Sequence, residues 1–268
     1  MRTGGGMHPG AWILWATCAG MVTFTTTNPF YLALVVAVAF FVYAAQRIPG
    51  PTARSFRVFA IAGLITLVVR TSLVFLGTVD AGNVAFAALE GARLATLLIV
   101  FGTFNSVTDP FGVVRLAPRR FHEPALAAAL ALSIAPRTVD AVGRVREAQS
   151  LRGLPTSWRT LPALAVPVLE TGMEEAVTLA ESMDARGHGR GRRTRYRPAR
   201  WTPAAAVVSV ASVVAAGVFV VAAWTQRGGL HPSTSPLLWP VVQPVLLAAI
   251  GLLTIPAFLP PPRPREDT

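Results

Sequence analysis

The sequence predicts an all-α integral membrane protein with about six transmembrane helices and long amphipathic cytoplasmic helices. Hydrophobic residues make up 53% of the 268 residues, and charged residues only 14%, against about 25% in average soluble domains. Several apolar runs approach the roughly 20 residues that a membrane-spanning helix needs. Most of the charge lies in one central region, so composition divides the chain into three parts.

Residues 1–104 hold four apolar segments, residues 105–200 form a polar region, and residues 201–268 hold two apolar segments and a short tail. The polar region contains 15 of the 24 arginines and 9 of the 13 acidic residues. We interpret 1–104 and 201–268 as transmembrane helices and 105–200 as a cytoplasmic helical region.

The chain opens with two short apolar segments, Ala11–Phe24 and Phe30–Ala45, separated by Thr25-Thr26-Thr27-Asn28-Pro29. They are typical of a helical hairpin or of two tilted spans joined by a tight turn. Four further spans are expected on length and hydrophobicity: Phe56–Leu76, Val84–Phe104, Ala204–Trp224 and Leu237–Leu259.

The arginines predict the orientation in the membrane. Arginines follow the second and fourth spans, whereas the loops 25–29 and 77–83 carry none and the last loop has only Arg227. Because cytoplasmic loops carry an excess of Arg and Lys, the arginine-rich side is expected to be cytoplasmic. Six spans then place both termini in the cytoplasm, as in a multi-pass protein of the cell (inner) membrane.

Three helical pieces are expected in the polar region. The apolar Ala125–Ala135 is too short to span a membrane and is expected to end near Pro136. Val139–Leu151 and a segment from about Ala163 to Ala185 are amphipathic, with apolar residues at steps of three and four. Gly153 and Gly187 are natural C-terminal stops for these two helices.

The two amphipathic helices end alike. Glu147 is followed five residues later by Arg152-Gly153, and Glu181 by Arg186-Gly187. A cation suits the negative end of the helix dipole, and a planar guanidinium can also bind a carboxylate of a partner. The sequence does not choose between a docking role and ordinary helix termination, because an arginine beside a C-cap glycine is common at helix ends.

Residue usage excludes several chemistries. Every basic residue in the chain is arginine, so the lysine of a Walker A loop or of a pyridoxal phosphate Schiff base cannot be supplied. Cys18 is the only cysteine, which excludes an internal disulfide and a cysteine zinc cluster. The four histidines have no metal-ligand spacing, and no Gly-x-Ser-x-Gly elbow is present. A chain that works with ATP would therefore need a partner to hydrolyse it.

Short motifs occur in a characteristic order: His8-Pro9, Asn28-Pro29, Ala88-Leu-Glu-Gly-Ala-Arg93-Leu, Thr108-Asp109-Pro110, Val145-Arg-Glu-Ala-Gln-Ser-Leu-Arg-Gly153, Leu161-Pro-Ala-Leu-Ala-Val-Pro-Val-Leu169 and Ala180-Glu-Ser-Met-Asp-Ala-Arg-Gly187. Together they resemble the transmembrane (T) subunit of energy-coupling factor (ECF) transporters, the group that includes the cobalt-type permease component. The resemblance covers most of the chain.

The resemblance implies a machine of four parts. Two cytoplasmic ABC-type ATPase subunits would use ATP and Mg²⁺, and a small membrane substrate-binding (S) subunit would bind a vitamin or a transition-metal ion. This chain would be a non-catalytic scaffold without a cofactor of its own. Its cytoplasmic helices would be coupling helices that dock on the ATPases through two motifs: Leu151, Arg152 and Gly153, and Ala185, Arg186 and Gly187. Leu151 departs from the family pattern, which has alanine there.

Three ionisable residues lie within predicted spans: Arg70, Glu90 and Arg93. Intramembrane charges mark function or pairing. We expect a structural ion pair that packs the third and fourth spans together, or alternatively a contact with the S subunit.

Two alternative functions are compatible with the sequence. The chain could be the pore-forming permease half of another ATP-driven importer or, from a different class, a membrane enzyme of unrecognised type. The basic extension Arg190–Arg200 is expected to contact anionic lipid headgroups, or alternatively the ATPases. No nucleic acid partner is expected.

Overall fold

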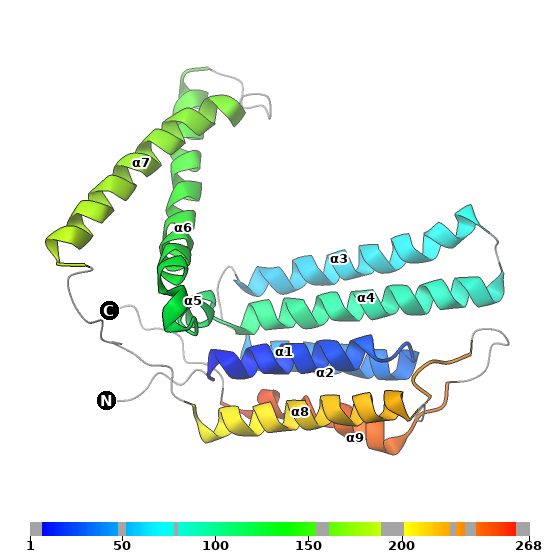
Figure 1. The fold of residues 1–268 in the computed structure, drawn as a ribbon. Coiled ribbons are helices and arrows are strands. Elements are labelled where there is room, and N and C mark those ends of the chain that lie inside the picture. The colour runs from blue at the N-terminus through cyan, green and yellow to red at the C-terminus, as the bar shows by residue number, and fades with distance from the viewer. Residues whose placement is uncertain are drawn as a thin grey trace. The chain divides into compact units, whose positions relative to one another are not determined.

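The computed structural model describes residues 7–47, 52–77, 80–153, 161–188, 201–225, 229–233 and 240–260. Within these ranges the chain forms helices and loops and no strand, so the all-α prediction is confirmed (Figure 1). The α-helices are α1 Pro9–Phe24, α2 Pro29–Gln46, α3 Thr52–Ser72, α4 Ala81–Val107, α5 Pro110–Val114, α6 His122–Leu151, α7 Leu161–Ala185, α8 Pro203–Trp224 and α9 Pro244–Leu252. The 3₁₀ helices are η1 Leu73–Leu76, η2 Arg119–Phe121 and η4 Ile255–Phe258.

The chain divides into two compact units. Met1–Leu116 and Ala199–Thr268 form a helical bundle, and Ala117–Pro198 forms a second unit that contains α6 and α7. We call them the bundle and the two-helix unit. The short helix α5 belongs to the bundle, so the second unit begins later than the polar region 105–200 seen in the sequence.

Four bundle helices start with a capping residue followed by proline. The dipeptides are His8-Pro9, Asn28-Pro29, Asp109-Pro110 and Thr202-Pro203, at the starts of α1, α2, α5 and α8. In each, the side chain of the first residue accepts a backbone N–H of the first turn. Proline is suited to the first helical position because its missing N–H has no partner there in any case. These dipeptides fix the starts of the helices locally.

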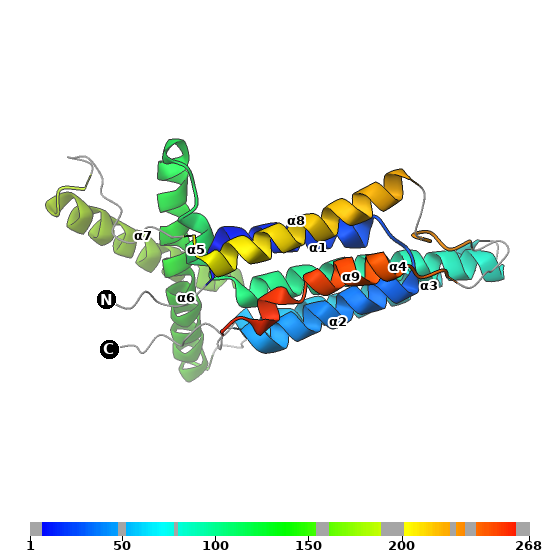
Figure 2. The same ribbon diagram turned by 90° about the horizontal axis from the view of Figure 1, so that it is seen from below.

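The bundle core lies between α1, α2, α8 and α9, with α4 closing one side (Figures 1 and 2). Its largest fully buried side chains include Trp15, Tyr31, Phe219 and Ile250. The indole N–H of Trp15 donates to the carbonyl of Leu253 at 3.0 Å. A buried aromatic N–H thus has its acceptor, as such groups require.

Helix α3 lies outside this core and packs along α4 (Figure 1). Small residues permit the close approach. A Cβ at Gly102 of α4 would lie 2.7 Å from the Cβ of Phe59, and one at Gly63 of α3 would lie 3.1 Å from the carbonyl oxygen of Ala95. Small residues at helix contacts are typical of membrane helix pairs.

Five described helices are long and apolar enough to cross a membrane: Pro29–Gln46, Ser55–Leu76, Ala81–Val107, Glu123–Leu151 and Pro203–Trp224. Four of them match expected spans. The first segment forms a helix of only 16 residues, α1. The fifth candidate, within α6, was not expected to span. These apolar helices support a membrane protein, and the helices long enough to span are not the same set as the six expected segments.

The segment expected as the span Leu237–Leu259 does not form one continuous helix in its described part. Helix α9 has nine residues, and η4 follows after a turn. Pro256 has no N–H to donate, and its ring would collide with the carbonyl of Leu252 in a continuous helix. The turn is instead closed by the N–H groups of Leu253 and Thr254, which bond the carbonyls three residues back. Residues 237–239 lie outside the described ranges.

The predicted helix end near Pro136 is also wrong, because α6 runs unbroken through it for 30 residues. Proline removes a single donor, the one that would bond Leu132. Nearby carbonyls gain side-chain donors: the Ser133 hydroxyl donates to Leu130 at 2.8 Å and the Thr138 hydroxyl to Ile134 at 3.2 Å. Because α6 is one continuous helix, its apolar part is long enough to cross a membrane, whereas the 11 residues Ala125–Ala135 alone are too short.

Candidate functional site

The two arginine–glycine segments occupy equivalent places at the ends of α6 and α7. Arg152 is the C-cap residue of α6, and Gly153 follows with a φ of 72°. Arg186 follows the last residue of α7, and Gly187 has a φ of 73°. This left-handed conformation favours glycine, which has no Cβ to clash with the following carbonyl.

The glycine hydrogen bonds match at the two ends, whereas the arginine N–H bonds differ: Arg152 donates to the Gln149 carbonyl at 3.1 Å, three residues back, and Arg186 to the Ser182 carbonyl at 3.2 Å, four residues back. The Gly153 N–H donates to the Ser150 carbonyl at 3.0 Å, and the Gly187 N–H to the Asp184 carbonyl at 2.8 Å. After Gly187, the His188 N–H donates to the Met183 carbonyl at 2.9 Å, which completes a Schellman motif. The glycine therefore has the same left-handed conformation and an equivalent hydrogen bond at both ends, directly after each arginine.

Both arginines are exposed, and Leu151 beside the first of them is 85% exposed. Neither guanidinium forms a salt bridge with a carboxylate of the described residues. An exposed cation at the negative end of a helix is electrostatically favourable, and its donors remain available to a carboxylate or carbonyl of another molecule. Sequence reasoning identified these residues, and the structure shows their shared backbone geometry.

The apolar face of α7 is divided between two environments. Ala176, Ala180 and Met183 line a pocket of about 350 Å³ together with Leu130 and Ile134 of α6. Nearer the start of α7, Val166, Leu169 and Met173 are 64–69% exposed. The stripe that the sequence predicted as one face thus packs on α6 over only part of its length.

The intramembrane charges Glu90 and Arg93 form a salt bridge of 2.7 Å on α4, with 17% and 19% of their side chains exposed. Arg93 also reaches α1: its Nη1 donates to the Phe24 carbonyl at 3.5 Å, and its guanidinium carbon lies 5.1 Å from the Phe24 ring centroid. Arg93 therefore links α4 to α1, and among the described residues no salt bridge joins this pair to α3. Arg70 on α3 is half-buried and forms no salt bridge with a described carboxylate.

The choice of α1 has a physical reason. Phe24 is the last residue of α1, and the last four carbonyls of a helix have no intrahelical donor. The guanidinium supplies positive charge at that negative helix end and a cation–π contact with the ring. Sequence spacing identifies the i,i+3 pair, but it cannot indicate which neighbouring helix ends at the level of Arg93.

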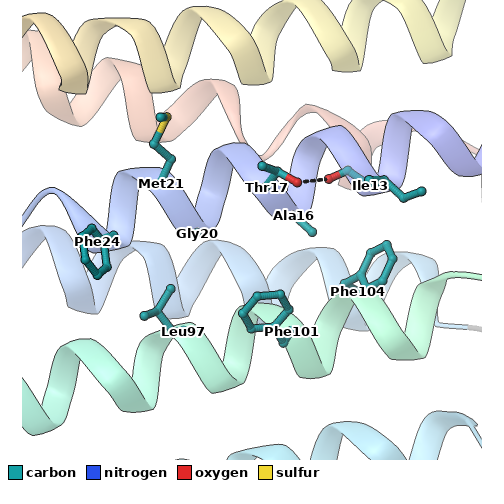
Figure 3. A pocket seen from close by; sticks show the side chains of 9 residues that line it. All are labelled: Ile13, Ala16, Thr17, Gly20, Met21, Phe24, Leu97, Phe101 and Phe104. Atoms are coloured by element: carbon teal, nitrogen blue, oxygen red, sulfur yellow. Dashed lines mark hydrogen bonds between the residues drawn. The ribbon is translucent and has the colours of Figure 1, made fainter.

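An apolar groove of about 450 Å³ lies between α1 and α4 (Figure 3). The hydroxyl of Thr17 donates to the Ile13 carbonyl at 2.8 Å, so it adds no free polar group to the lining. Sequence reasoning missed the groove; the small residues Ala16 and Gly20, four apart on α1, were the available signal. Its lining is Ile13, Ala16, Thr17, Gly20, Met21, Phe24, Leu97, Phe101 and Phe104.

A buried amide also escaped sequence reasoning. Asn28 is fully buried, and its Nδ2 donates to the carbonyls of Gly229 at 2.8 Å and Val241 at 3.0 Å. Its Oδ1 accepts the N–H of Phe30 at 3.0 Å. The residue that caps α2 thus also holds the segments between α8 and α9. The Asn-Pro dipeptide marked a break between two apolar segments in the sequence, but it gave no sign of the distant partners.

No group of three or more His, Cys, Asp or Glu side chains suited to a metal ion occurs among the described residues. The basic extension 190–200 lies outside the described ranges. No protein-family model matches the chain, and a search of characterised proteins finds no significant match. Fold and site together define an all-helical membrane protein with two exposed arginines at equivalent helix ends.

Proposed function

We propose that this chain is the transmembrane coupling subunit of an ECF-type ATP-driven importer. In this proposal two ATPase subunits bind one copy of the chain on its cytoplasmic side. A separate membrane S subunit binds the cargo, a vitamin or a transition-metal ion. The chain transmits the conformational change of the ATPases and hydrolyses no ATP itself.

The observation that carries the proposal is the matched geometry of Arg152 and Arg186. Two long helices are each followed by an arginine and then by a glycine with the same left-handed φ, whose N–H bonds the carbonyl three residues back. Two equivalent ends are suited to two copies of one partner, because each copy would present the same acceptors to the same backbone and guanidinium. Ordinary helix termination explains each end singly but gives no reason for the pair.

The amino-acid composition supports the assignment of ATP hydrolysis to partner subunits. The chain has no lysine for a nucleotide phosphate site, and its charge is concentrated around the proposed docking helices. In this proposal α6 and α7 are coupling helices. The charged second half of α6, which holds Arg137, Asp140, Arg144, Arg146 and Glu147, is more compatible with that role than with a place in the hydrocarbon core.

The test is co-purification of the chain with its ATPases in mild detergent, comparing the native chain with Arg152→Glu, Arg186→Glu and the double variant. Each single charge-reversal variant is expected to bind the ATPases about 30-fold more weakly, which corresponds to a loss of roughly 2 kcal/mol at an interface hot spot. Arg144→Glu is the matched control, since Arg144 is an exposed arginine of α6 away from the helix end. Undiminished co-purification of the double variant would refute the docking role.

Stoichiometry separates the proposal from the pore-forming permease alternative. A coupling subunit binds two ATPases per copy of this chain, whereas a permease half pairs with a like subunit and binds one. Native mass spectrometry of the purified complex gives this ratio. Catalytic activity of the chain purified alone would instead favour the membrane-enzyme alternative.

A further inference from the structure

The chain leaves the bundle after Leu116 and returns to it before Trp201. The bundle segments just before and just after the two-helix unit both contact the start of α1, at His8, Pro9 and Gly10. We call 109–116 the outgoing connector and 201–202 the returning connector. They are more than 80 residues apart in sequence, so their meeting at one short turn is a tertiary feature.

The outgoing connector lies against Pro9. A Cβ at Gly112 of α5 would be 2.9 Å from Cγ of Pro9, closer than real side chains approach, so with the proline ring in place a larger residue would force the two apart. Asp109 fixes the start of α5, because its Oδ1 accepts the N–H of Phe111 at 3.1 Å. The glycine therefore permits direct contact between α5 and the start of α1.

The returning connector lies against His8. The ring of Trp201 stacks on the imidazole with centroids 4.6 Å apart and planes 19° from parallel. His8 is 7% exposed, and its Nδ1 accepts the N–H of Gly10 at 3.1 Å. Trp201 directly precedes Thr202, the N-cap of α8, so the stack fixes the chain at the start of α8.

Helix capping alone does not account for histidine at position 8. Asparagine, aspartate and serine are the preferred N-cap residues and would accept the same N–H. They lack the flat ring on which Trp201 stacks. Histidine serves both purposes, and the adjacent proline and glycine allow close contact on either side.

We propose that His8, Pro9 and Gly10 form a clasp that holds both connectors of the two-helix unit at one point on α1. These are positioning residues, and the clasp stays closed while the protein works. A movement of the two-helix unit would then be transmitted to α1. Because α1 packs against α8 and α4, it would reach those helices as well. The existence of the clasp stands on the contacts above, whereas its part in coupling rests on the proposed function.

A disulfide tests the contact directly. An ideal Cβ at Gly112 lies 3.7 Å from Cβ of Pro9, within the Cβ–Cβ range of about 3.5–4.5 Å for disulfides. In a Cys18→Ala background, Pro9→Cys with Gly112→Cys is expected to lose maleimide labelling on mild oxidation. Gly20→Cys with Gly112→Cys is the control, because position 20 lies about 16 Å further along α1. Continued labelling of the first pair would overturn the clasp.

Hydrogen exchange in detergent tests whether the clasp acts as one unit. His8→Ala removes both cap and stack, so exchange is expected to rise roughly three- to tenfold in both connectors, as for loss of one aromatic contact and a cap. His8→Asn keeps the cap and should loosen only the returning connector. His231→Ala, at the Thr27 contact, is the matched control and should affect neither. Unchanged exchange in the outgoing connector of His8→Ala would overturn the single clasp.

Uptake assays in the complete complex test the role in coupling. His8→Ala is expected to lower cargo uptake per ATP hydrolysed about tenfold while ATPase binding persists. Adding the oxidised Pro9→Cys/Gly112→Cys disulfide should restore uptake, and reductant should remove the rescue. Loss of uptake in the oxidised pair with His8 intact would overturn the closed clasp. Failure of any ATPase to bind the native chain would refute the proposed function instead, leaving the labelling and exchange results to decide the clasp.

Discussion

The guanidinium of Arg93 lies over the ring of Phe24, 5.1 Å from its centroid, and donates to the carbonyl of the same residue at 3.5 Å. Arg93 is at the same time paired with Glu90 at 2.7 Å. One side chain therefore joins the end of α1 to α4 and neutralises a carboxylate in an apolar helix. Removing either charge leaves the other without its partner.

We expect Arg93→Gln to lower the free energy of unfolding by about 2 kcal/mol, less than the 3–5 kcal/mol of a fully buried pair because each side chain keeps some exposure. The double variant Glu90→Gln/Arg93→Gln should recover part of the loss, since no unpaired carboxylate remains. Denaturant unfolding in detergent micelles measures both. A double variant less stable than Arg93→Gln would contradict a charge-pairing role.

The contact of α3 with α4 predicts a steric effect. Gly102→Val should destabilise the protein by about 1–3 kcal/mol, because even its Cβ would lie 2.7 Å from Cβ of Phe59. Gly217→Val in α8 is the control: it has no neighbour within 4 Å, so it should cost well under half as much. Thermal unfolding of the two purified variants compares them, and equal losses would refute the close helix contact.

Asn28 predicts a polar effect on the loop between α8 and α9. Asn28→Ala leaves the carbonyls of Gly229 and Val241 without their donor, and the expected loss is about 2–3 kcal/mol. Thr17→Ala, which removes an exposed hydroxyl bonded within its own helix, should change stability by less than about 0.5 kcal/mol. Faster hydrogen exchange confined to residues 229–233 and 240–243 is the signature of the first variant; no change there would argue against the anchor.

The glycine at the end of α7 predicts that backbone shape matters for docking apart from charge. Gly187→Ala should destabilise the helix end by about 1 kcal/mol, because alanine is strained at a φ of 73°. ATPase binding should weaken although Arg186 is retained. Gly172→Ala, within the same helix and with open space around it, should be neutral or slightly stabilising. Co-purification compares the two variants, and equal binding would show that the turn is not needed.

Local signals predicted those features that depend on neighbouring residues in the chain. Asn28-Pro29 marked the break between the first two apolar segments, and Gly153 and Gly187 marked helix ends where the structure has positive φ. The same local reasoning failed at Pro136, where proline suggested a helix end but the helix continues. Proline removes one donor, and whether a helix tolerates that loss depends on its surroundings.

The sequence by itself determined the helical class, the apolar character of the spans and the paired arginine ends, because hydrophobicity, capping and glycine conformation act over a few residues. Only the tertiary structure decided that Arg93 reaches α1, that Asn28 holds the segments beyond α8, and that both connectors meet at His8 and Pro9. These contacts join residues that are 69 to 213 positions apart in the sequence. Helix packing sets them, and periodicity carries no information about which helices become neighbours.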